Sequence, residues 1–593
     1  MKKVTVIVER DKCSPNRCRR ECMKYDPLNK AGKEGFHLGS HGKAEIDEEL
    51  VTEMHRICAN KCPFGAIKIV KLPEKLNQNP IHRFGQNLFE LYSLPIIKEN
   101  TIVGIIGRNG IGKSTALQII AGQIMPNLGN FKTLPSEEEI LGKYSTQVLG
   151  KYFKKLFEKK LEIAYKPQRV ELLGSIYKGK TVQELLEKAD ERKITKELVK
   201  QLDMKAVLNS TIEELSGGEL QRLAVIAALA KKADVVYLDE PSSFLDIAHR
   251  IKMAKIIREY TKGKSVVIIE HDLATLDYIS DEIQIVYGEP AAFGVFSQSK
   301  AVRRGINEYL DGYLMDDNVK FRNYAINFKG TSVAREVSPE VLLETEELEK
   351  VFDRFHLQVS SMTIKKAEVL AIMGANGLGK STFLKLLVHE IKPDKGKPPS
   401  LKISYKPQYL DHHREETVEE YLRMIAGEEF DSGWYKQNLL EKLGINNILK
   451  NKIEYLSGGE LQKIHIAACL SDQEADLFAL DEPSAFVDVE DRLKVAEIIK
   501  EFVTRKEKAA LVVDHDIQFV DYLADSLLVF EGIPGREGHV CGPLEKEEGM
   551  NRILKNLDIT YRKDKQTGRP RINKPDSQLD QEQRAEGKYY YAI

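Results

Sequence analysis

Gly107-Arg108-Asn109-Gly110-Ile111-Gly112-Lys113-Ser114-Thr115 is a glycine-rich segment between an apolar run, Thr101–Ile106, and a helical pattern, Ala116–Ala121. A strand, a glycine-rich loop and a helix in this order are the context of a phosphate-binding P-loop. The glycines let the backbone approach phosphate oxygens, and the loop amides and the helix N-terminus attract them. We therefore expect Lys113 to reach the β- and γ-phosphates and Ser114 to hold Mg²⁺.

The motif occurs a second time, as Gly374-Ala375-Asn376-Gly377-Leu378-Gly379-Lys380-Ser381-Thr382, directly after the apolar run Val369–Met373. Two matches in the same structural context predict two nucleotide sites. The P-loop residues expected to bind ATP are Gly107, Asn109, Gly110, Gly112, Lys113, Ser114 and Thr115 in the first copy and Gly374, Asn376, Gly377, Gly379, Lys380, Ser381 and Thr382 in the second.

The composition favours a globular cytosolic protein of several domains. The chain has 593 residues, of which 42% are hydrophobic and 30% charged, and its net charge is −1. No apolar run approaches the roughly 20 residues of a membrane span, and the N-terminus lacks an apolar signal core. A net charge so close to zero supplies no overall field, so any contact with nucleic acid must come from local patches.

Further motifs repeat at a nearly constant spacing. The offsets lie between 240 and 244 residues for Tyr165–Gln168 and Tyr405–Gln408, Leu215–Arg222 and Leu456–Lys463, Leu238–Ser242 and Leu480–Ser484, and His271 and His515. The P-loops are offset by 374 − 107 = 267, so the first copy carries 267 − 240 = 27 extra residues. They fall at about 131–160, where apolar residues at helical spacing predict a small helical hairpin; a solvated surface insertion is the alternative.

The repeated residues suggest the parts of an ATPase. Asp239 and Asp481 end short apolar strands, where each carboxylate can hold Mg²⁺ through water. Glu240 and Glu482 follow directly and can polarise the attacking water. Further catalytic and Mg²⁺-sensing candidates are His271 and His515, placed to contact the γ-phosphate, and Gln168 and Gln408, placed to sense Mg²⁺ and water. The base could stack on Phe84, Phe89 or Phe355, although a role as core aromatics is equally open.

These motifs, in this order and twice, resemble the ATP-binding cassette (ABC) family over about 80–290 and 341–531. The resemblance implies that two cassettes close head to tail, with each ATP between the P-loop of one and the signature of the other. The first P-loop would then pair with Ser457, Gly458 and Gly459, and the second with Ser216, Gly217 and Gly218.

Five of the seven cysteines lie near the N-terminus, which in a cytosolic chain indicates metal rather than disulfides. The two runs, Cys13-x4-Cys18-x3-Cys22-x3-Asp26-Pro27 and Thr52-x2-His55-x2-Cys58-x3-Cys62-Pro63, resemble bacterial ferredoxin motifs with three ligands replaced. In two-cluster ferredoxins the fourth cysteine of each run binds the other run's cluster.

This exchange of ligands predicts one complete set and one broken set. Cys13, Cys18, Cys22 and Cys62 would bind one [4Fe–4S] cluster. The second set retains a single thiolate, in Thr52, His55, Cys58 and Asp26. Asp26, His55 and Cys58 have ligand types that suit another metal such as zinc, but we favour a metal-free remnant.

A two-cluster domain before tandem cassettes resembles subfamily E of the ABC proteins, the ribosome-recycling or RNase L inhibitor family. Gly305–Tyr313 resembles the first hinge of that family, and Gly549–Arg552 with Thr567–Pro575 resembles the second. We expect an α/β fold of tandem P-loop ABC-type nucleotide-binding domains behind a small α+β ferredoxin-like domain. The expected limits are 1–75 for the iron–sulfur domain, 76–300 for the first cassette, 301–340 for hinge 1, 341–545 for the second cassette and 546–593 for hinge 2 and the tail.

The resemblance implies an Mg²⁺-dependent ATPase that splits ribosomal subunits after termination or rescue, as closure of the cassettes swings the N-terminal domain. Its implied partners are the small ribosomal subunit and its rRNA, a release factor or a Pelota-like rescue factor, and initiation factors, with no membrane. The alternative is an ATP-switched ribosome-binding factor that does not split subunits, or a specialised paralogue. The basic segment Arg562–Lys574 is either a solvated end or a patch against phosphate.

Overall fold

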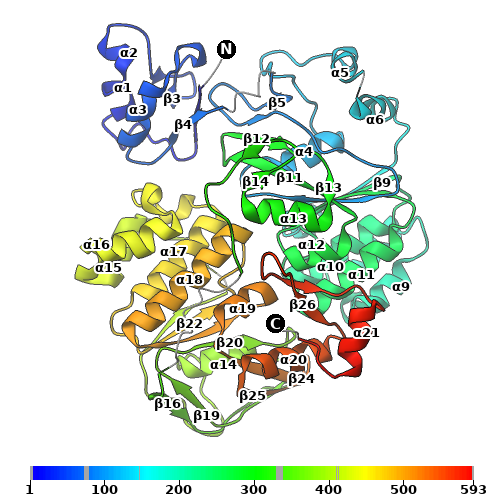
Figure 1. The fold of residues 1–593 in the computed structure, drawn as a ribbon, viewed down its shortest axis with the longest axis vertical. Coiled ribbons are helices and arrows are strands. Elements are labelled where there is room, and N and C mark those ends of the chain that lie inside the picture. Colours follow the sequence, from blue (N-terminus) through cyan, green and yellow to red (C-terminus); the bar gives the residue numbers. More distant parts are fainter. Residues whose placement is uncertain are drawn as a thin grey trace. The chain divides into compact units, whose positions relative to one another are not determined.

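The computed structural model describes residues 4–72, 79–145, 147–328, 338–408, 410–411 and 413–590. The chain forms two compact units, one of Met1–Leu245 with His249–Ala325 and one of Asp246–Ala248 with Ile326–Ile593 (Figure 1). The predicted boundary at 75/76 lies outside the described residues, as does the part of hinge 1 at 329–337. No helix among the described residues has the length and apolarity needed to cross a membrane.

The N-terminal domain is small and mixed α+β. Its two long strands, β1 (Val4–Val8) and β4 (Ile67–Lys71), pair antiparallel, and α3 (Arg56–Lys61) packs against β4. The remaining elements are α1 (Glu21–Lys24), α2 (Pro27–Lys30), β2 (His37–Leu38), β3 (Ala44–Glu45), η1 (Glu48–Leu50) and η2 (Glu53–His55). The domain has its own core, which includes three of the cysteines, Cys13, Cys22 and Cys58.

Asn87 ties this domain to the first cassette within the same unit. Its backbone has a left-handed φ of 55°. Its amide nitrogen donates to the Glu48 carboxylate at 2.8 Å, and its carbonyl oxygen accepts from the Val8 amide at 2.8 Å. Its side-chain oxygen accepts from the Ile46 amide at 3.0 Å. A small apolar cluster that includes Ile7 and Phe293 adds to these contacts.

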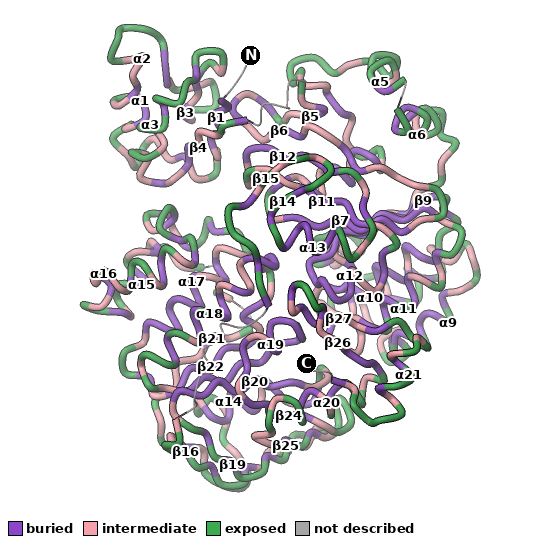
Figure 2. Tube along the Cα trace, in the orientation of Figure 1, coloured by how far each residue is buried: buried purple, intermediate pink, exposed green. Residues whose placement is uncertain are grey.

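The first cassette is built on a sheet of strand order β5-β6-β12-β11-β7-β10-β9-β8, in which β11, β7, β10, β9 and β8 run parallel. The parallel strands are rich in Val and Ile because helices cover both faces of such a sheet. The strands are β5 (His82–Arg83), β6 (Glu90–Leu91), β7 (Ile102–Ile106), β8 (Ile163–Lys166), β9 (Val235–Asp239), β10 (Ser265–Ile269), β11 (Glu282–Glu289), β12 (Phe293–Phe296), β13 (Lys300–Ala301), β14 (Tyr313–Leu314) and β15 (Val319–Lys320). The helices are α4 (Lys113–Ile120), α5 (Glu137–Tyr144), α6 (Val148–Phe157), α7 (Leu172–Ile176), α8 (Val182–Ala189), α9 (Thr195–Gln201), α10 (Gly217–Ala230), α11 (Ile247–Tyr260), α12 (Leu273–Ile279) and α13 (Val302–Asp311). Figure 2 shows the central strands β7 and β9 as buried.

The segment 131–160 contains the helix pair α5 and α6. Ser136 begins α5 with a reciprocal capping box to Glu139. The pair lies against the cassette through Tyr152, whose hydroxyl donates to the Ile120 carbonyl at 2.6 Å and lies 2.5 Å from the Tyr237 hydroxyl. These buried contacts fix the helix pair on the end of α4.

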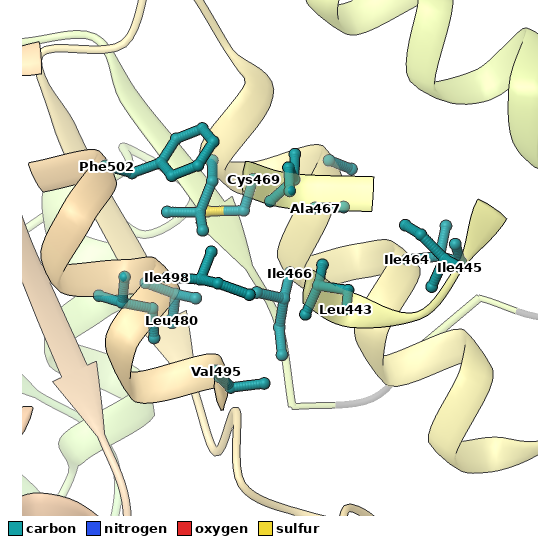
Figure 3. Packing of buried hydrophobic residues seen from close by; sticks show 14 of the residues in the cluster. Leu443, Ile445, Ile464, Ile466, Ala467, Cys469, Leu480, Val495, Ile498 and Phe502 are labelled. Carbon is teal, nitrogen blue, oxygen red and sulfur yellow. The ribbon is translucent and has the colours of Figure 1, made fainter. Parts of the chain in front are cut away.

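The second cassette repeats the design, with strand order β17-β18-β25-β24-β20-β23-β22-β21. Its strands are β16 (Val341–Thr345), β17 (Leu348–Val351), β18 (His356–Val359), β19 (Met362–Lys365), β20 (Val369–Met373), β21 (Ile403–Lys406), β22 (Leu477–Asp481), β23 (Ala509–Val513), β24 (Ser526–Ile533) and β25 (Glu537–Glu545). Its helices are α14 (Lys380–Leu387), α15 (Val418–Ala426), α16 (Gly433–Tyr435), α17 (Gly458–Ser471), α18 (Val489–Lys506) and α19 (Ile517–Leu523). In Figure 3, Ile466 and Cys469 of α17 pack with Ile498 and Phe502 of α18 against Leu480 of β22.

The C-terminal segment folds onto the second cassette. It contains α20 (Lys546–Asn556), β26 (Tyr561–Lys563), β27 (Pro570–Ile572) and α21 (Gln578–Ala585). The Gln518 side chain donates to the Pro570 carbonyl at 3.1 Å, and the Phe328 amide to the Thr567 carbonyl at 3.2 Å. Arg569, in the basic segment, is fully buried, so that part of the segment is not a solvated end.

Candidate ATP sites and cysteine cluster

Both P-loops have a backbone that only glycine fits. Gly112 and Gly379, which precede α4 and α14, have φ of 87° and 90°. A Cβ at Gly112 would lie 2.6 Å from the Phe89 ring, and one at Gly379 would lie 2.9 Å from the Phe355 ring. The rings of Phe89 and Phe355 therefore pack directly against the P-loop glycines. Of the three aromatic candidates for base stacking, Phe84 alone has an exposed ring.

The two P-loop lysines are buried and fold back over their own loops. Lys113 Nζ donates to the carbonyls of Gly107 at 2.9 Å and Arg108 at 2.7 Å. Lys380 Nζ donates to Gly374 at 3.0 Å and to the next carbonyl at 2.7 Å. Burial lowers the pKa of Lys380 to about 8, against the opposing effect of nearby carboxylates. Both ammonium groups thus lie where the loop amides and the helix N-terminus converge.

A buried carboxylate and a hydroxyl lie together at each P-loop. Burial raises the pKa of Asp239 to about 6, while the nearby Ser114 hydroxyl and the ammonium groups of Lys166 and Lys113 act in the opposite direction. Burial also raises the pKa of Asp481, against a hydrogen bond with Ser381. Hydroxyl and carboxylate oxygens beside a phosphate site are the donors that Mg²⁺ prefers, so these residues fit that ion.

Glu240 and Glu482, which directly follow these aspartates, each lie at the centre of a polar cluster. Gln168 Nε2 donates to Glu240 Oε1 at 2.7 Å, and His271 Nε2 lies 3.4 Å from the same oxygen. Burial alone would raise the pKa of Glu240, but the close approach of His271, the Lys113 ammonium and the Ser243 hydroxyl bring it to about 2. The predicted residues Gln168, Glu240 and His271 are therefore brought together.

The second cassette has the same arrangement with one difference. Gln408 Nε2 donates to Glu482 Oε1 at 2.9 Å, and His515 Nε2 lies 3.7 Å from that oxygen. In the first cassette the Ser243 hydroxyl also donates to Glu240 Oε2 at 3.1 Å. The corresponding residue of the second cassette, at an offset of 242, is Ala485, which has no hydroxyl.

The signature residues begin one 14-residue helix in each cassette, α10 in the first and α17 in the second. Ser216 caps α10 and Ser457 caps α17, each in a capping box with the glutamate three residues later. The glycines that follow, Gly217 and Gly218 in the first copy and Gly458 and Gly459 in the second, occupy the first turn. A helix N-terminus whose first two residues are glycines offers their amides to an anion.

Two pairs of residues that the motif reading did not single out bind the backbone of the glutamates. Lys166 Nζ donates to the carbonyls of Asp239 at 2.6 Å and Glu240 at 3.0 Å, and Gln221 Nε2 also donates to Glu240 O. Lys406 and Gln462 are their counterparts in the second cassette. The signal was present in the sequence, because both residue types recur at offsets of 240 and 241.

The four cysteines of the complete set line one cavity in the N-terminal domain, from the loop after β1, from α1 and from the end of α3. Burial raises the pKa of Cys22 to about 12, helped by its proximity to Cys62 and Cys13. Convergent thiols are the donor set of an iron–sulfur cluster. Within the described ranges, however, no three His, Cys, Asp or Glu side chains are gathered tightly enough to hold a single metal ion.

The second set is instead closed by protein groups. Asp26 is fully buried and accepts from the Leu28 amide at 2.7 Å and the Phe36 amide at 2.6 Å, one to each carboxylate oxygen. His55 Nδ1 is bonded to Thr52, and His55 Nε2 lies 3.6 Å from Asp26. Cys58 is buried nearby in α3, and burial raises the pKa of its thiol to about 12. These residues do not fit a second cluster.

Comparison with known proteins matches both parts of the chain. The ABC transporter family model matches residues 95–243 and 357–485, and a model described as a possible Fer4-like domain in RNase L inhibitor matches residues 6–34. The chain is 39% identical to ABC transporter E family member 1 of Arabidopsis thaliana, over 99% of this chain and 98% of that protein.

Two solved archaeal structures are similar over most or all of their length. One is a model of ribosome-bound archaeal Pelota and ABCE1, at 45% identity and a TM-score of 0.93, covering 100% of this chain and 99% of that one. The other is the complex of archaeal ribosomal stalk protein aP1 with the archaeal ribosome recycling factor aABCE1, at 47% identity and a TM-score of 0.82, covering 87% and 99%. The expected fold class is confirmed, and the chain belongs to the E family of ABC proteins, the RNase L inhibitor family of tandem-cassette ATPases.

Proposed function

We propose that this chain uses ATP to split ribosomal subunits after termination or rescue. One observation carries the proposal: the chain matches ribosome-bound ABCE1 along its whole length, including the N-terminal domain and the C-terminal segment. The proposed partners are the small ribosomal subunit with its rRNA, a release factor or Pelota-like factor, and initiation factors. Its place of action would then be the cytoplasm.

We assign the ATP chemistry to the two clusters built on the P-loops. Lys113 and Lys380 would bind the β- and γ-phosphates, and the hydroxyls of Ser114 and Ser381 with the carboxylates of Asp239 and Asp481 would hold Mg²⁺. Bound Mg²⁺ would neutralise phosphate charge. Gln168 and Gln408 would orient water near it.

Glu240 and Glu482 would each take a proton from the attacking water, since their carboxylates contact Gln168 and Gln408 and are not needed for Mg²⁺. His271 and His515, which contact the same carboxylates, would hold the γ-phosphate side of the site. The signature amides at Ser216–Gly218 and Ser457–Gly459 would close on the nucleotide of the opposite cassette; this pairing stays a prediction.

We also infer that the N-terminal domain holds one [4Fe–4S] cluster on Cys13, Cys18, Cys22 and Cys62. The shared cavity of the four thiols supports this ligand set. A cluster would cross-link the loop after β1 to α1 and α3 and so stiffen a domain with short helices. The closed set of Asp26, His55 and Cys58 argues against a second cluster, because Asp26 already accepts two backbone hydrogen bonds.

The test is subunit splitting by the purified, anaerobically prepared protein. Archaeal ribosomes and a Pelota-type factor are mixed with the protein and Mg-ATP, and subunits are separated on sucrose gradients. We expect free subunits with ATP and none with ADP. Stable binding to small subunits with ATP but no splitting of whole ribosomes would instead support an ATP-switched binding factor and would refute the recycling proposal.

A further inference from the structure

The backbone of each catalytic glutamate is held in an unusual conformation. Glu240 and Glu482 have φ of 48° and 49°, in the left-handed region that non-glycine residues seldom occupy. Such a conformation persists only where surrounding contacts over-determine it, and it gathers at functional sites. The contacts that hold it therefore decide where the carboxylate points.

Three elements hold this backbone, and each belongs to a different part of the ATP site. The Glu240 amide donates to the Ile269 carbonyl of β10 at 2.9 Å, next to His271. Its carbonyl accepts from Lys166, the last residue of β8, and from Gln221 of α10, the signature helix. The strand that leads to Gln168 and the helix that begins with the signature thus meet at one peptide group.

The same junction is present in the second cassette, which serves as an independent copy. The Glu482 amide donates to Val513 of β23 at 2.8 Å. Its carbonyl accepts from Lys406 at 3.4 Å and from Gln462 at 2.6 Å, and Lys406 Nζ also donates to the Asp481 carbonyl at 2.6 Å. The two cassettes differ in many surface residues but keep this lysine and this glutamine.

The lysine is well suited to this task. Lys166 and Lys406 have exposures of 0% and 1%, and each ammonium lies among the site's carboxylates, Asp239, Glu240 and Glu270 in the first cassette and Asp481, Glu482 and Asp514 in the second. A buried charge needs several hydrogen bonds, and here the carbonyls of two successive residues supply them. A shorter or apolar side chain would release the aspartate carbonyl and leave the glutamate carbonyl to the glutamine alone.

We propose that Lys166 and Lys406 are positioning residues that fix the left-handed backbone of Glu240 and Glu482, and that with Gln221 and Gln462 they couple the signature helix to the direction of the catalytic carboxylate. Their ammonium groups bind backbone carbonyls, so they would act through the glutamates rather than on the nucleotide. The proposal rests on the assignment of these glutamates as general bases.

The test uses Lys166→Met and Lys406→Met, which keep most of the apolar stem and lose the donor, with Lys205→Met and Lys450→Met at exposed positions as matched controls. We expect kcat for ATP hydrolysis to fall at least tenfold in the double variant Lys166→Met/Lys406→Met, with the nucleotide dissociation constant within about twofold of the unaltered protein. The controls should retain kcat. A kcat within twofold, or an equal loss of nucleotide binding, would overturn the proposal.

A double-mutant cycle separates positioning from simple destabilisation. If each lysine acts through its own glutamate, adding Lys166→Met to Glu240→Gln, or Lys406→Met to Glu482→Gln, should cause no further loss of kcat. Additive losses would overturn the proposal. Normal ATP hydrolysis by the Glu→Gln variants would refute the general-base assignment. An unchanged kcat in the Lys→Met variants would refute only the positioning role, so the two failures can be distinguished.

Variants that keep a donor or change the other partner cover the case in which Lys→Met does not fold. Lys406→Arg should retain more activity than Lys406→Met, and Gln221→Met with Gln462→Met should reproduce the loss of kcat. Folding is read from Trp434, the single tryptophan, which packs on Phe502 in the second cassette with ring centroids 4.8 Å apart. Unchanged kcat in the folded glutamine variants would overturn the coupling.

Discussion

Gln168 donates a 2.7 Å hydrogen bond from its side-chain amide to Oε1 of Glu240, and so joins the end of β8 to the end of β9. Gln408 makes the same contact with Glu482 at 2.9 Å. The bond fixes one carboxylate oxygen, while His271, Lys113 and Ser243 hold the pKa of Glu240 low, so that the carboxylate stays ionised. The loss of that ionised carboxylate is the most direct test of the site.

Glu240→Gln and Glu482→Gln should each abolish hydrolysis at one site, because an amide cannot take a proton from water. A general base contributes about 10²- to 10⁴-fold, so the double variant should fall by that factor. The measurement is steady-state phosphate release with retained radiolabelled ATP after gel filtration. Normal turnover in both single variants would contradict the assignment.

Ser243 should make the two sites unequal. Its hydroxyl donates to Glu240 Oε2, whereas Ala485 leaves Glu482 without this bond. Since a donor lowers the basicity of a carboxylate, Ser243→Ala in a Glu482→Gln background should raise turnover at the first site by about twofold to fivefold. Ala485→Ser in a Glu240→Gln background should lower it. If neither substitution changes the turnover of its Glu→Gln background, this hydroxyl has no catalytic effect.

Cys22→Ser and Cys58→Ser form a matched pair for the cluster, because both thiols are buried in helices of the same domain. The unaltered protein should contain about four irons per chain, corresponding to one cluster. Cys22→Ser should lose them, and Cys58→Ser should keep them. Iron and acid-labile sulfide on anaerobic protein measure this. About eight irons, halved by Cys58→Ser, would mean that the second set also binds a cluster.

His465 should make the second cassette sensitive to acid. Burial lowers its pKa to about 4, with Lys406 and Arg414 acting in the same direction and the Asp411 backbone opposing them. Between pH 6.5 and pH 4, His465 is therefore neutral in the folded state but protonated in the unfolded state. The resulting stabilisation is complete above pH 6.5 and is lost as pH falls toward 4, by about 3 kcal/mol at most.

Denaturant unfolding followed by Trp434 fluorescence at pH 7.5 and pH 5 measures the effect. His465→Gln should lose less stability between the two pH values than the unaltered chain. The first cassette carries Ala224 at the corresponding position and lacks this titration. Identical pH dependence in both proteins would assign the acid sensitivity to other groups.

The sequence was most informative where one local motif implies one local geometry. The P-loops, the strands before Asp239 and Asp481 and the capped signature helices follow from spacing, because glycine and capping requirements act within a few residues. The burial of Arg569 could not be predicted, since it depends on how the C-terminal segment packs on the second cassette.

Lys166 was overlooked for a different reason. A lysine at the end of a strand normally extends into solvent, and only the tertiary contact of β8 with β9 turns it inward. Its recurrence as Lys406 does not by itself indicate a role, because lysine carries no ATP-site signature outside the P-loop.

Asn87 has a consequence for motion. Any swing of the N-terminal domain away from this position must break the hydrogen bonds to Val8, Ile46 and Glu48 together, because all three converge on one residue. Such a joint would open cooperatively rather than one hydrogen bond at a time. The domain would therefore keep its position during small fluctuations of the cassette. It would swing only when closure of the cassettes supplied enough free energy to break the three hydrogen bonds together.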